Sequence, residues 1–183
     1  HDALPIYFMI EVSDDIVLYP LSVDDIFKIF NTLNNEREYM REWLPFVDAT
    51  KEIEDTGNYV RYVLQTADKQ FTIYYKDQFV GLIGFKDTDT DNKKTEIGYW
   101  LSQHAQGKGI MIQSVAKLIE HAFGELDMNR IQIKVAVGND KSRRIPEKLG
   151  FQMEGIERDG ELLVDNVFTD IAVYSLLRKE YKK

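Results

Sequence analysis

The chain has 183 residues, 44% of them hydrophobic and 30% charged, and a formal net charge of −8. This length suits one domain that buries roughly 70% of its unfolded surface, and the negative charge argues against nucleic acid as the main ligand. The lack of cysteine excludes disulfides, thiolate metal sites and a cysteine nucleophile. No apolar run reaches the roughly 20 residues of a membrane span, so a cytoplasmic protein without a membrane partner is expected.

The N-terminal quarter predicts one strand followed by three helices. Ile16 to Tyr19 is branched and aromatic, which is typical of a strand. Ser22, with Asp25 three positions on, resembles a capping box that opens a helix. A second short helix is expected to end at Leu44-Pro45, and Thr50 is expected to cap a third. Residues 1–8 are expected to be a leader before a native start, so that the single domain covers residues 9–183.

The middle of the chain predicts a hairpin and a further strand. Phe71 to Lys76 and Phe79 to Lys86 flank Asp77-Gln78, a plausible hairpin turn. Lys94 to Leu101 is rich in aromatic and branched residues and predicts the next strand.

No metal site is predicted. The acidic run 87–91 resembles the start of a calcium loop, but its sixth position is Asn92 rather than glycine and its twelfth is Gly98 rather than glutamate. The three histidines have no spacing typical of a metal site. A solvated loop is therefore expected there.

The most informative stretch is Gln106-Gly107-Lys108-Gly109-Ile110-Met111, between a predicted strand and a predicted helix. Backbone N–H groups at such a helix start point at an anion, usually a phosphate, and a pyrophosphate could come close to Gly107 and Gly109 because they lack side chains. A dinucleotide fingerprint fails because the third glycine is missing, and a P-loop fails because Gly109 follows Lys108 where Ser or Thr is needed. The helix stripe consists of Ile112, Val115, Ala116, Ile119, Ala122, Phe123 and Leu126.

The C-terminal part predicts strands around one short helix. Arg130 to Val137 alternates apolar and polar residues, which indicates a strand. Lys141 to Leu149 is expected to form a helix closed by Gly150, and Phe151 to Arg158 and Val167 to Leu177 are expected to be the last strands. The order of elements is mixed α/β, without the strict alternation of a doubly wound sheet.

Several ordered motifs resemble those of the GNAT N-acetyltransferases. Gln106-x-x-Gly109-x-Met111 resembles the family's Arg/Gln-x-x-Gly-x-Gly/Ala pyrophosphate loop, and it is followed by Asn139-x-x-Ser142 and by Glu147-Lys148-Leu149-Gly150-Phe151 in the family's order and spacing. Further segments resemble the branch that acetylates ribosomal-protein N-termini: Glu96 to Leu101, Trp43-Leu44-Pro45 and Glu154-Gly155. The resemblance spans nearly the whole chain beyond the first dozen residues.

This resemblance implies an α/β (α+β) fold with a mixed, mostly antiparallel central sheet flanked by helices. The strand that ends at Trp100-Leu101 is expected to part from its neighbour in a splay that accommodates acetyl-CoA, and an N–H near Trp100 or Leu101 is expected to polarise the thioester carbonyl. The implied activity is acetyl transfer from acetyl-CoA to a primary amine. The implied cofactor-binding residues are Trp100, Leu101, Gln106, Gly107, Lys108, Gly109, Ile110, Met111, Asn139 and Ser142.

The sequence departs from the family pattern in two places. Met111 stands where glycine or alanine is usual, and we expect its side chain to point away from the phosphates. Many members carry a tyrosine in the helix after the asparagine, whereas this chain has Ile145-Pro146-Glu147-Lys148 there. In the resembling branch a serine is the suggested acid, which maps to Ser142, and the suggested base maps to Glu161. Glu96, on the strand beside the thioester, is the other candidate base.

The acceptor is expected to be a protein or peptide α-amine, such as that of a ribosomal protein. An α-amine with a pKa near 7.7–8.0 loses its proton more easily than a lysine amine near 10.4. Trp43, Phe46 and Phe85 are the candidate acceptor-binding residues, and the last strand is a candidate homodimer surface. Two alternatives stay open: a small-amine acetyltransferase for a polyamine or aminoglycoside, and a non-catalytic acyl-CoA-binding regulatory module.

Overall fold

The computed structural model describes residues 9–181, and the expected leader at 1–8 lies outside the described residues. The strands are β1 Ile10–Glu11, β2 Ile16–Pro20, β3 Gln70–Tyr75, β4 Gln78–Asp89, β5 Lys94–Leu101, β6 Arg130–Ala136, β7 Gln152–Leu163 and β8 Val167–Leu177. The α-helices are α2 Ile26–Asn35, α3 Arg37–Met40, α4 Phe46–Ala49, α5 Ile53–Leu64, α6 Ile110–Gly124 and α7 Asp140–Lys148. Four 3-10 turns complete the elements: η1 Val23–Asp25, η2 Gln103–Ala105, η3 Val164–Asn166 and η4 Arg178–Glu180.

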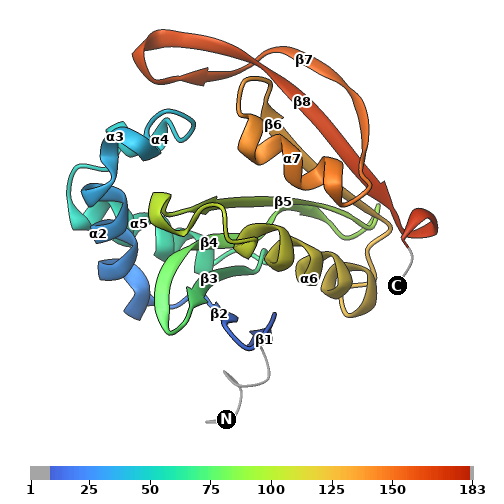
Figure 1. The fold of residues 1–183 in the computed structure, drawn as a ribbon, viewed down its shortest axis with the longest axis horizontal. Helices are drawn as coiled ribbons and strands as arrows, with labels where there is room; N and C mark the ends of the chain where they lie inside the picture. Colours follow the sequence, from blue (N-terminus) through green and yellow to red (C-terminus); the bar gives the residue numbers. More distant parts are fainter. Residues whose placement is uncertain (1–8, 182–183) are drawn as a thin grey trace.

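One eight-stranded sheet, in the order β1-β2-β3-β4-β5-β6-β8-β7, connects these elements (Figure 1). Its paired neighbours are antiparallel except for β5 and β6, which run parallel. A parallel pair needs a crossover, and α6 supplies it between the two strands. The fold is therefore the mixed, mostly antiparallel sheet with flanking helices that the sequence predicts.

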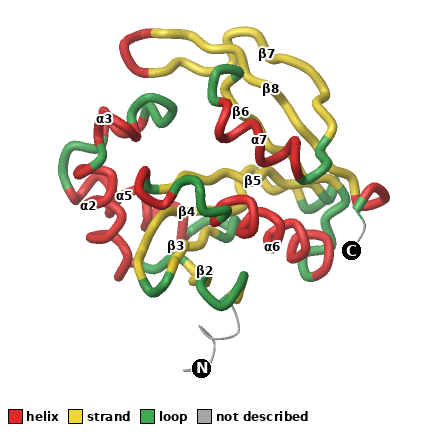
Figure 2. The backbone as a smooth tube through the Cα atoms, in the orientation of Figure 1, coloured by secondary structure: helices red, strands yellow, loops and turns green. Residues whose placement is uncertain are grey.

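Two apolar clusters pack against opposite faces of the sheet; Figure 2 shows the helices that cover them, α6 for one and α2 with α5 for the other. The cluster under α6 includes Val115, Leu118 and Ile119 of the helix and Ile83, Ile97 and Ile131 of the sheet. The cluster under α2 and α5 includes Ile29, Leu33, Val60, Val63 and Leu82. Successive side chains of a strand point to opposite faces, so Tyr99 of β5 borders the first cluster while Trp100 borders the second.

The helix stripe of α6 is confirmed in its centre. Val115, Ile119, Ala122 and Phe123 are buried, Ile112 and Ala116 are only partly buried, and Leu126 lies beyond the end of the helix. A run of apolar residues at helical spacing thus predicted the buried face but not the last turn.

The capping predictions were right at one helix and wrong at another. Ser22 and Asp25 form the predicted capping box, although a 3-10 turn precedes α2 itself. Thr50 does not cap a third helix. Its backbone N–H and its hydroxyl both donate to Phe46 O, at 3.1 and 2.9 Å, so it ends α4, and α5 is capped instead by Glu52.

Three predicted boundaries need correction. β4 continues to Asp89, so residues 87–89 belong to this strand and not to the expected solvated loop. The second helix, α3, ends at Met40 rather than at Leu44-Pro45. The hairpin turn consists of Lys76 and Asp77 rather than Asp77-Gln78, because Gln78 already pairs with Tyr75. Both turn residues have positive φ, 48° and 67°, as the primed turns that match strand twist require.

The C-terminal hairpin is longer than predicted. The last strand has the predicted bounds, but β7 continues five residues past Arg158, to Leu163. Its register against β8 shifts between Glu157 and Glu161, and such a bulge interrupts the alternation by which a strand is recognised in sequence.

Of the residues at 9–181, no helix is long and apolar enough to cross a membrane.

Candidate cofactor and active site

The site begins where the two parallel strands separate. Only three residue pairs join β5 to β6, the last of them Glu96 with Gln132. Beyond this point β5 stays paired with β4 as far as Leu101, and β6 stays paired with β8 as far as Ala136. The predicted splay is therefore present, and it opens toward the C-terminal ends of both strands.

Backbone groups of β5 face this splay. Ser102 N donates to Val80 O at 2.7 Å, and alternate residues of an antiparallel strand direct their N–H groups to the same neighbour. Trp100 therefore directs its N–H toward β4, whereas Tyr99 and Leu101 direct theirs into the splay. Of the two residues expected to polarise a thioester carbonyl, the register favours Leu101.

The glycine loop lies at the open end of the splay and has the backbone that its sequence predicts. Gly107 and Gly109 have φ values of +79° and +74°, a region that favours glycine. Gly109 is the N-cap of α6 and makes no side-chain capping bond, and the first helical turn has no acidic residue. The first N–H groups of a helix have no partner within it, so this turn presents donors to an anion.

Neighbouring elements hold the loop. Glu36, between α2 and α3, accepts from Gln103 N at 2.8 Å and from the Ser102 hydroxyl. The Gln106 amide donates to Tyr39 Oη at 3.0 Å and lies 3.5 Å from Leu101 O. The predicted loop residue Gln106 therefore links the end of β5 to α3.

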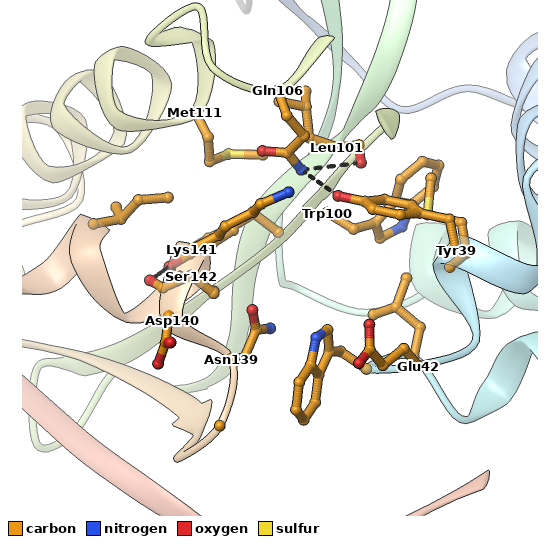
Figure 3. Close-up of a pocket in the computed structure, with 16 residues that line it drawn as sticks. Tyr39, Glu42, Trp100, Leu101, Gln106, Met111, Asn139, Asp140, Lys141 and Ser142 are labelled. Carbon is orange, nitrogen blue, oxygen red and sulfur yellow. Dashed lines mark hydrogen bonds between the residues drawn. The ribbon is translucent and has the colours of Figure 1, made fainter. Parts of the chain in front are cut away.

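A pocket of about 300 Å³ fills the splay. Its walls come from four places: the segment after α3, β5, the glycine loop with the start of α6, and the start of α7 (Figure 3). The lining residues are Tyr39, Met40, Glu42, Trp43, Leu44, Tyr99, Trp100, Leu101, Gln106, Met111, Gly138, Asn139, Asp140, Lys141, Ser142 and Ile145. Seven residues predicted for cofactor or acceptor are thus brought together: Trp43, Trp100, Leu101, Gln106, Met111, Asn139 and Ser142.

Some predicted site residues lie elsewhere. Phe85 is 1% exposed in the cluster under α6, so the expectation that it contacts the acceptor is wrong. Phe46 begins α4 and is half exposed, but it does not line the pocket. Gly107 to Ile110 adjoin the lining rather than belonging to it, and Met111 is buried yet reaches the pocket wall.

The two candidate bases share one environment outside the pocket. Glu96 accepts from the Gln132 amide at 3.3 Å and lies 3.8 Å from the Lys86 ammonium. Burial raises the pKa of Glu96, against the opposing charges of Lys86 and Lys134. Glu161 is exposed at the surface, but neighbouring atoms desolvate its carboxyl in part and raise its pKa, against the same two lysines. Both carboxyls are therefore shifted toward the range in which a general base works.

Ser142 lies on the other side of the splay. It is in the first turn of α7, and its hydroxyl donates to Tyr99 Oη at 3.3 Å. Side chains alternate along β5, so Glu96 and Tyr99 point to opposite faces of the sheet. The candidate base Glu96 and the candidate acid Ser142 therefore approach the splay from opposite sides.

Sequence reasoning missed four residues of this site: Glu36, Tyr39, Tyr99 and Lys141. Tyr99 could have been found, because period-two alternation puts it on the same side of β5 as the predicted Leu101. Lys141 reaches across the pocket toward Gln106 (Figure 3), with its ammonium 5.9 Å from the centre of the Tyr39 ring. Glu36 and Tyr39 belong to a helix pair far from the loop in sequence, where no motif marks them. The residues at 9–181 contain no cluster of metal-ligating side chains.

Comparison with known proteins agrees with this geometry. The GNAT acetyltransferase domain matches residues 15–152. YdaF of Bacillus subtilis strain 168, provisionally assigned as a ribosomal N-acetyltransferase, is 32% identical over 96% of this chain and 98% of its own. The ribosomal-protein-serine acetyltransferase of Escherichia coli strain K12 is 29% identical over 91% of this chain and 94% of its own.

Solved structures agree as well. The crystal structure of a probable acetyltransferase superposes with a TM-score of 0.87 at 31% identity, over 96% of this chain and 99% of the other. The microcin C7 self-immunity acetyltransferase MccE, solved with acetyl-CoA and AMP, superposes with a TM-score of 0.85 at 27% identity, over 92% and 95%. The protein is thus an acyltransferase. It belongs to the GNAT acetyltransferase family.

Proposed function

We propose that this enzyme transfers an acetyl group from acetyl-CoA to the α-amine of a protein or peptide N-terminus. One observation carries the first half of the proposal: a glycine loop with free helix N–H groups lies at the open end of a strand splay, and a pocket between β5 and α7 occupies that splay. This combination suits a ligand that is anionic at one end and long and amide-bearing at the other. MccE, a structural neighbour, was solved with acetyl-CoA.

The residues present fit such a cofactor. The N–H groups of Gly107 to Met111 would take the pyrophosphate, with the Lys108 ammonium nearby. The backbone groups that Tyr99 directs into the splay would pair with pantetheine amides as an added strand does. Asn139, the N-cap of α7, would offer its amide on the opposite wall. Acetyl-CoA, when bound, supplies an activated thioester.

The chain's own residues would manage the protons. Glu161 or Glu96 takes a proton from the acceptor ammonium, directly or through water, so that the amine is free to attack. The new N–C bond forms as the C–S bond breaks, Ser142 gives its hydroxyl proton to the departing sulfur, and the nitrogen of the new amide gives up its second proton to water. The N–H of Leu101 would face the carbonyl oxygen as it gains charge. Exchange with water then restores Ser142 and the carboxylate.

Two considerations favour an α-amine over a lysine side chain. The first is the lower pKa of the α-amine, which matches a base of modest strength. The second is the relative in Escherichia coli, which is named a ribosomal-protein-serine acetyltransferase and aligns with 91% of this chain. Trp43 and Glu42 line the pocket on the side of the N-terminal helices, and they are the candidate acceptor contacts.

We further propose a homodimer and a cytoplasmic location. Large apolar side chains of the β7–β8 hairpin are exposed: Met153, Ile156, Leu162, Val167 and Phe168. A second copy would cover this surface, and equilibrium sedimentation of wild type beside Phe168→Asp tests it. A dimer that the substitution leaves intact would overturn the assignment of the surface.

Release of coenzyme A thiol tests the activity, because a protein without cysteine gives little background with thiol reagents. Acceptors would be peptides with N-terminal serine, alanine or methionine, polyamines and aminoglycosides. Turnover on peptides alone supports the proposal. Turnover on small amines alone would show that the enzyme is a small-amine acetyltransferase instead. Tight cofactor binding without turnover on any amine would support the non-catalytic acyl-CoA-binding regulatory module.

Glu161→Gln and Glu96→Gln assign the base. The variant that loses the larger part of kcat while it keeps its affinity for coenzyme A carries the base. Equal, small effects in both would show that water alone accepts the proton.

A further inference from the structure

A tyrosine hydroxyl bridges the two walls of the splay. Tyr99 belongs to β5, the first wall, and Ser142 belongs to α7, which directly follows the second wall, β6. The Tyr99 hydroxyl donates to Ser142 O at 3.2 Å and accepts from the Ser142 hydroxyl at 3.3 Å. One phenol is thus bonded to both the backbone and the side chain of the same serine.

Packing alone does not account for this hydroxyl. The Tyr99 ring borders the apolar cluster under α6, a role that phenylalanine would fill equally well. A polar group placed among apolar neighbours is unfavourable unless it is hydrogen-bonded, and both of its bonds go to one residue of the pocket. The hydroxyl therefore fixes Ser142 rather than β5.

The phenol is suited to holding a partner and poorly suited to giving up its proton. Burial raises the pKa of Tyr99 well above its usual value, so the group stays neutral throughout the working pH range. A general acid works best when its pKa lies near the ambient pH. Tyr99 would therefore keep its own proton while it holds the serine that gives one away.

We propose that Tyr99 is a positioning residue for acetyl transfer, which holds the Ser142 hydroxyl at the pocket between β5 and α7. The inference rests on the proposed function, in which Ser142 protonates the departing sulfur. α7 itself has Ile145-Pro146-Glu147-Lys148 and no tyrosine, so the protonation is left to Ser142, which the phenol of β5 holds.

A second tyrosine offers a matched control. The Tyr174 hydroxyl also binds α7, donating to Glu147 Oε2 at 2.8 Å and accepting from Arg143 Nε at 2.9 Å. It belongs to β8 and does not line the pocket. Tyr174→Phe therefore loosens the same helix without touching Ser142.

The experiment is a double-mutant cycle of Tyr99→Phe and Ser142→Ala, with kcat for a peptide and the Kd of coenzyme A measured for each variant. We expect Tyr99→Phe to lower kcat about tenfold, since a misplaced acid loses part of the usual 10²–10⁴-fold contribution, and to leave the Kd within about twofold. In the Ser142→Ala background the same change should have no further effect on kcat, because the residue it positions is gone. Tyr174→Phe should leave kcat within about twofold.

Three results would overturn the inference. Effects of Tyr99→Phe and Ser142→Ala that multiply would show independent roles. A loss of coenzyme A affinity in Tyr99→Phe that matches its loss of kcat would make Tyr99 part of the binding wall only. An unchanged kcat in Ser142→Ala would show that Ser142 is not the general acid, so that Tyr99 would have no acid to position. Failure of the proposed function looks different, because the wild-type enzyme would then acetylate no peptide at all.

Discussion

The indole of Trp43 lies against Gly138: a Cβ atom on Gly138 would stand 3.2 Å from Trp43 Cη2. Trp43 follows α3 and Gly138 follows β6, so this contact joins the N-terminal helices to the second wall of the splay. Both residues line the pocket. The absence of a side chain at Gly138 therefore sets how closely the two sides of the pocket approach.

Gly138→Ala should displace the indole by a few tenths of an ångström. Gly138 does not have a positive φ among the described glycines, so alanine adds bulk without backbone strain. We expect the KM for a peptide acceptor to rise about fivefold while the Kd of coenzyme A changes less, because the loss falls on acceptor binding. Gly124→Ala, where a Cβ meets nothing within 4 Å, is the control. A larger effect on coenzyme A than on the peptide would contradict the assignment of Trp43 to the acceptor.

Gly109→Val should abolish cofactor binding. The substitution puts a branched side chain at φ +74°, where such residues are strained by about 1–3 kcal/mol, and it places bulk where the pyrophosphate must approach. Titration calorimetry with acetyl-CoA would detect the loss. Gly150→Val is the matched control, since Gly150 has φ +85° and lies after α7, outside the pocket. It should lose stability but keep its affinity, and retained affinity in Gly109→Val would refute the site.

Glu154 is expected to contribute stability that depends on pH. Hydrogen bonds from Arg130, at 2.9 Å to Oε1, and from the Ser175 hydroxyl lower the pKa of Glu154 to about 2. A lowered pKa means that the contribution is present above the unfolded value near 4.5 and is lost as the pH falls toward 2. The carboxyl is 40% exposed, so after screening we expect Glu154→Gln to cost only about 1 kcal/mol at pH 7. Urea denaturation at pH 7 and pH 3 should show the difference shrinking; a constant difference would contradict it.

Glu96 should behave in the opposite way. Burial raises its pKa above 4.5, so the folded protein binds this proton more tightly than the unfolded chain does. The cost of ionising Glu96 is absent below pH 4.5 and grows as the pH rises through the folded pKa. Glu96→Gln should therefore be more stable than wild type at pH 7 and equally stable at pH 4 by thermal denaturation. If Glu96→Gln instead gained more stability over wild type at pH 4 than at pH 7, burial would not be the cause of the raised pKa of Glu96.

Local patterns predicted much of this fold and the cofactor half of the site. The glycine loop was recoverable because its backbone conformation requires residues without side chains at two fixed positions, Gly107 and Gly109. The bounds of β5 were recoverable because its burial follows its aromatic and branched residues. The predicted helix cap at Thr50 was wrong because the Thr50 hydroxyl donates to Phe46 O, four residues earlier. Such local side-chain bonds compete with capping, and tertiary packing decides between them.

The acceptor half was not recoverable in the same way. Phe85 and Trp43 are both large aromatics, and only packing shows that the first is enclosed under α6 while the second reaches the pocket. Glu161 follows a register shift on β7, so counting along the strand gives no orientation for its side chain. Contacts between elements far apart in sequence determine these positions, and no single-sequence pattern encodes them.

The short pairing of β5 with β6 has a mechanical consequence. Only three residue pairs connect the larger part of the sheet, β1 to β5, to the smaller part, β6 to β8. A ligand that forms hydrogen bonds with the edges of both β5 and β6 would add contacts between the two parts and make the sheet more rigid there. Saturation at 100 times the Kd would add about 2.7 kcal/mol to the free energy of unfolding, so the substrate would double as a structural part of the enzyme that consumes it.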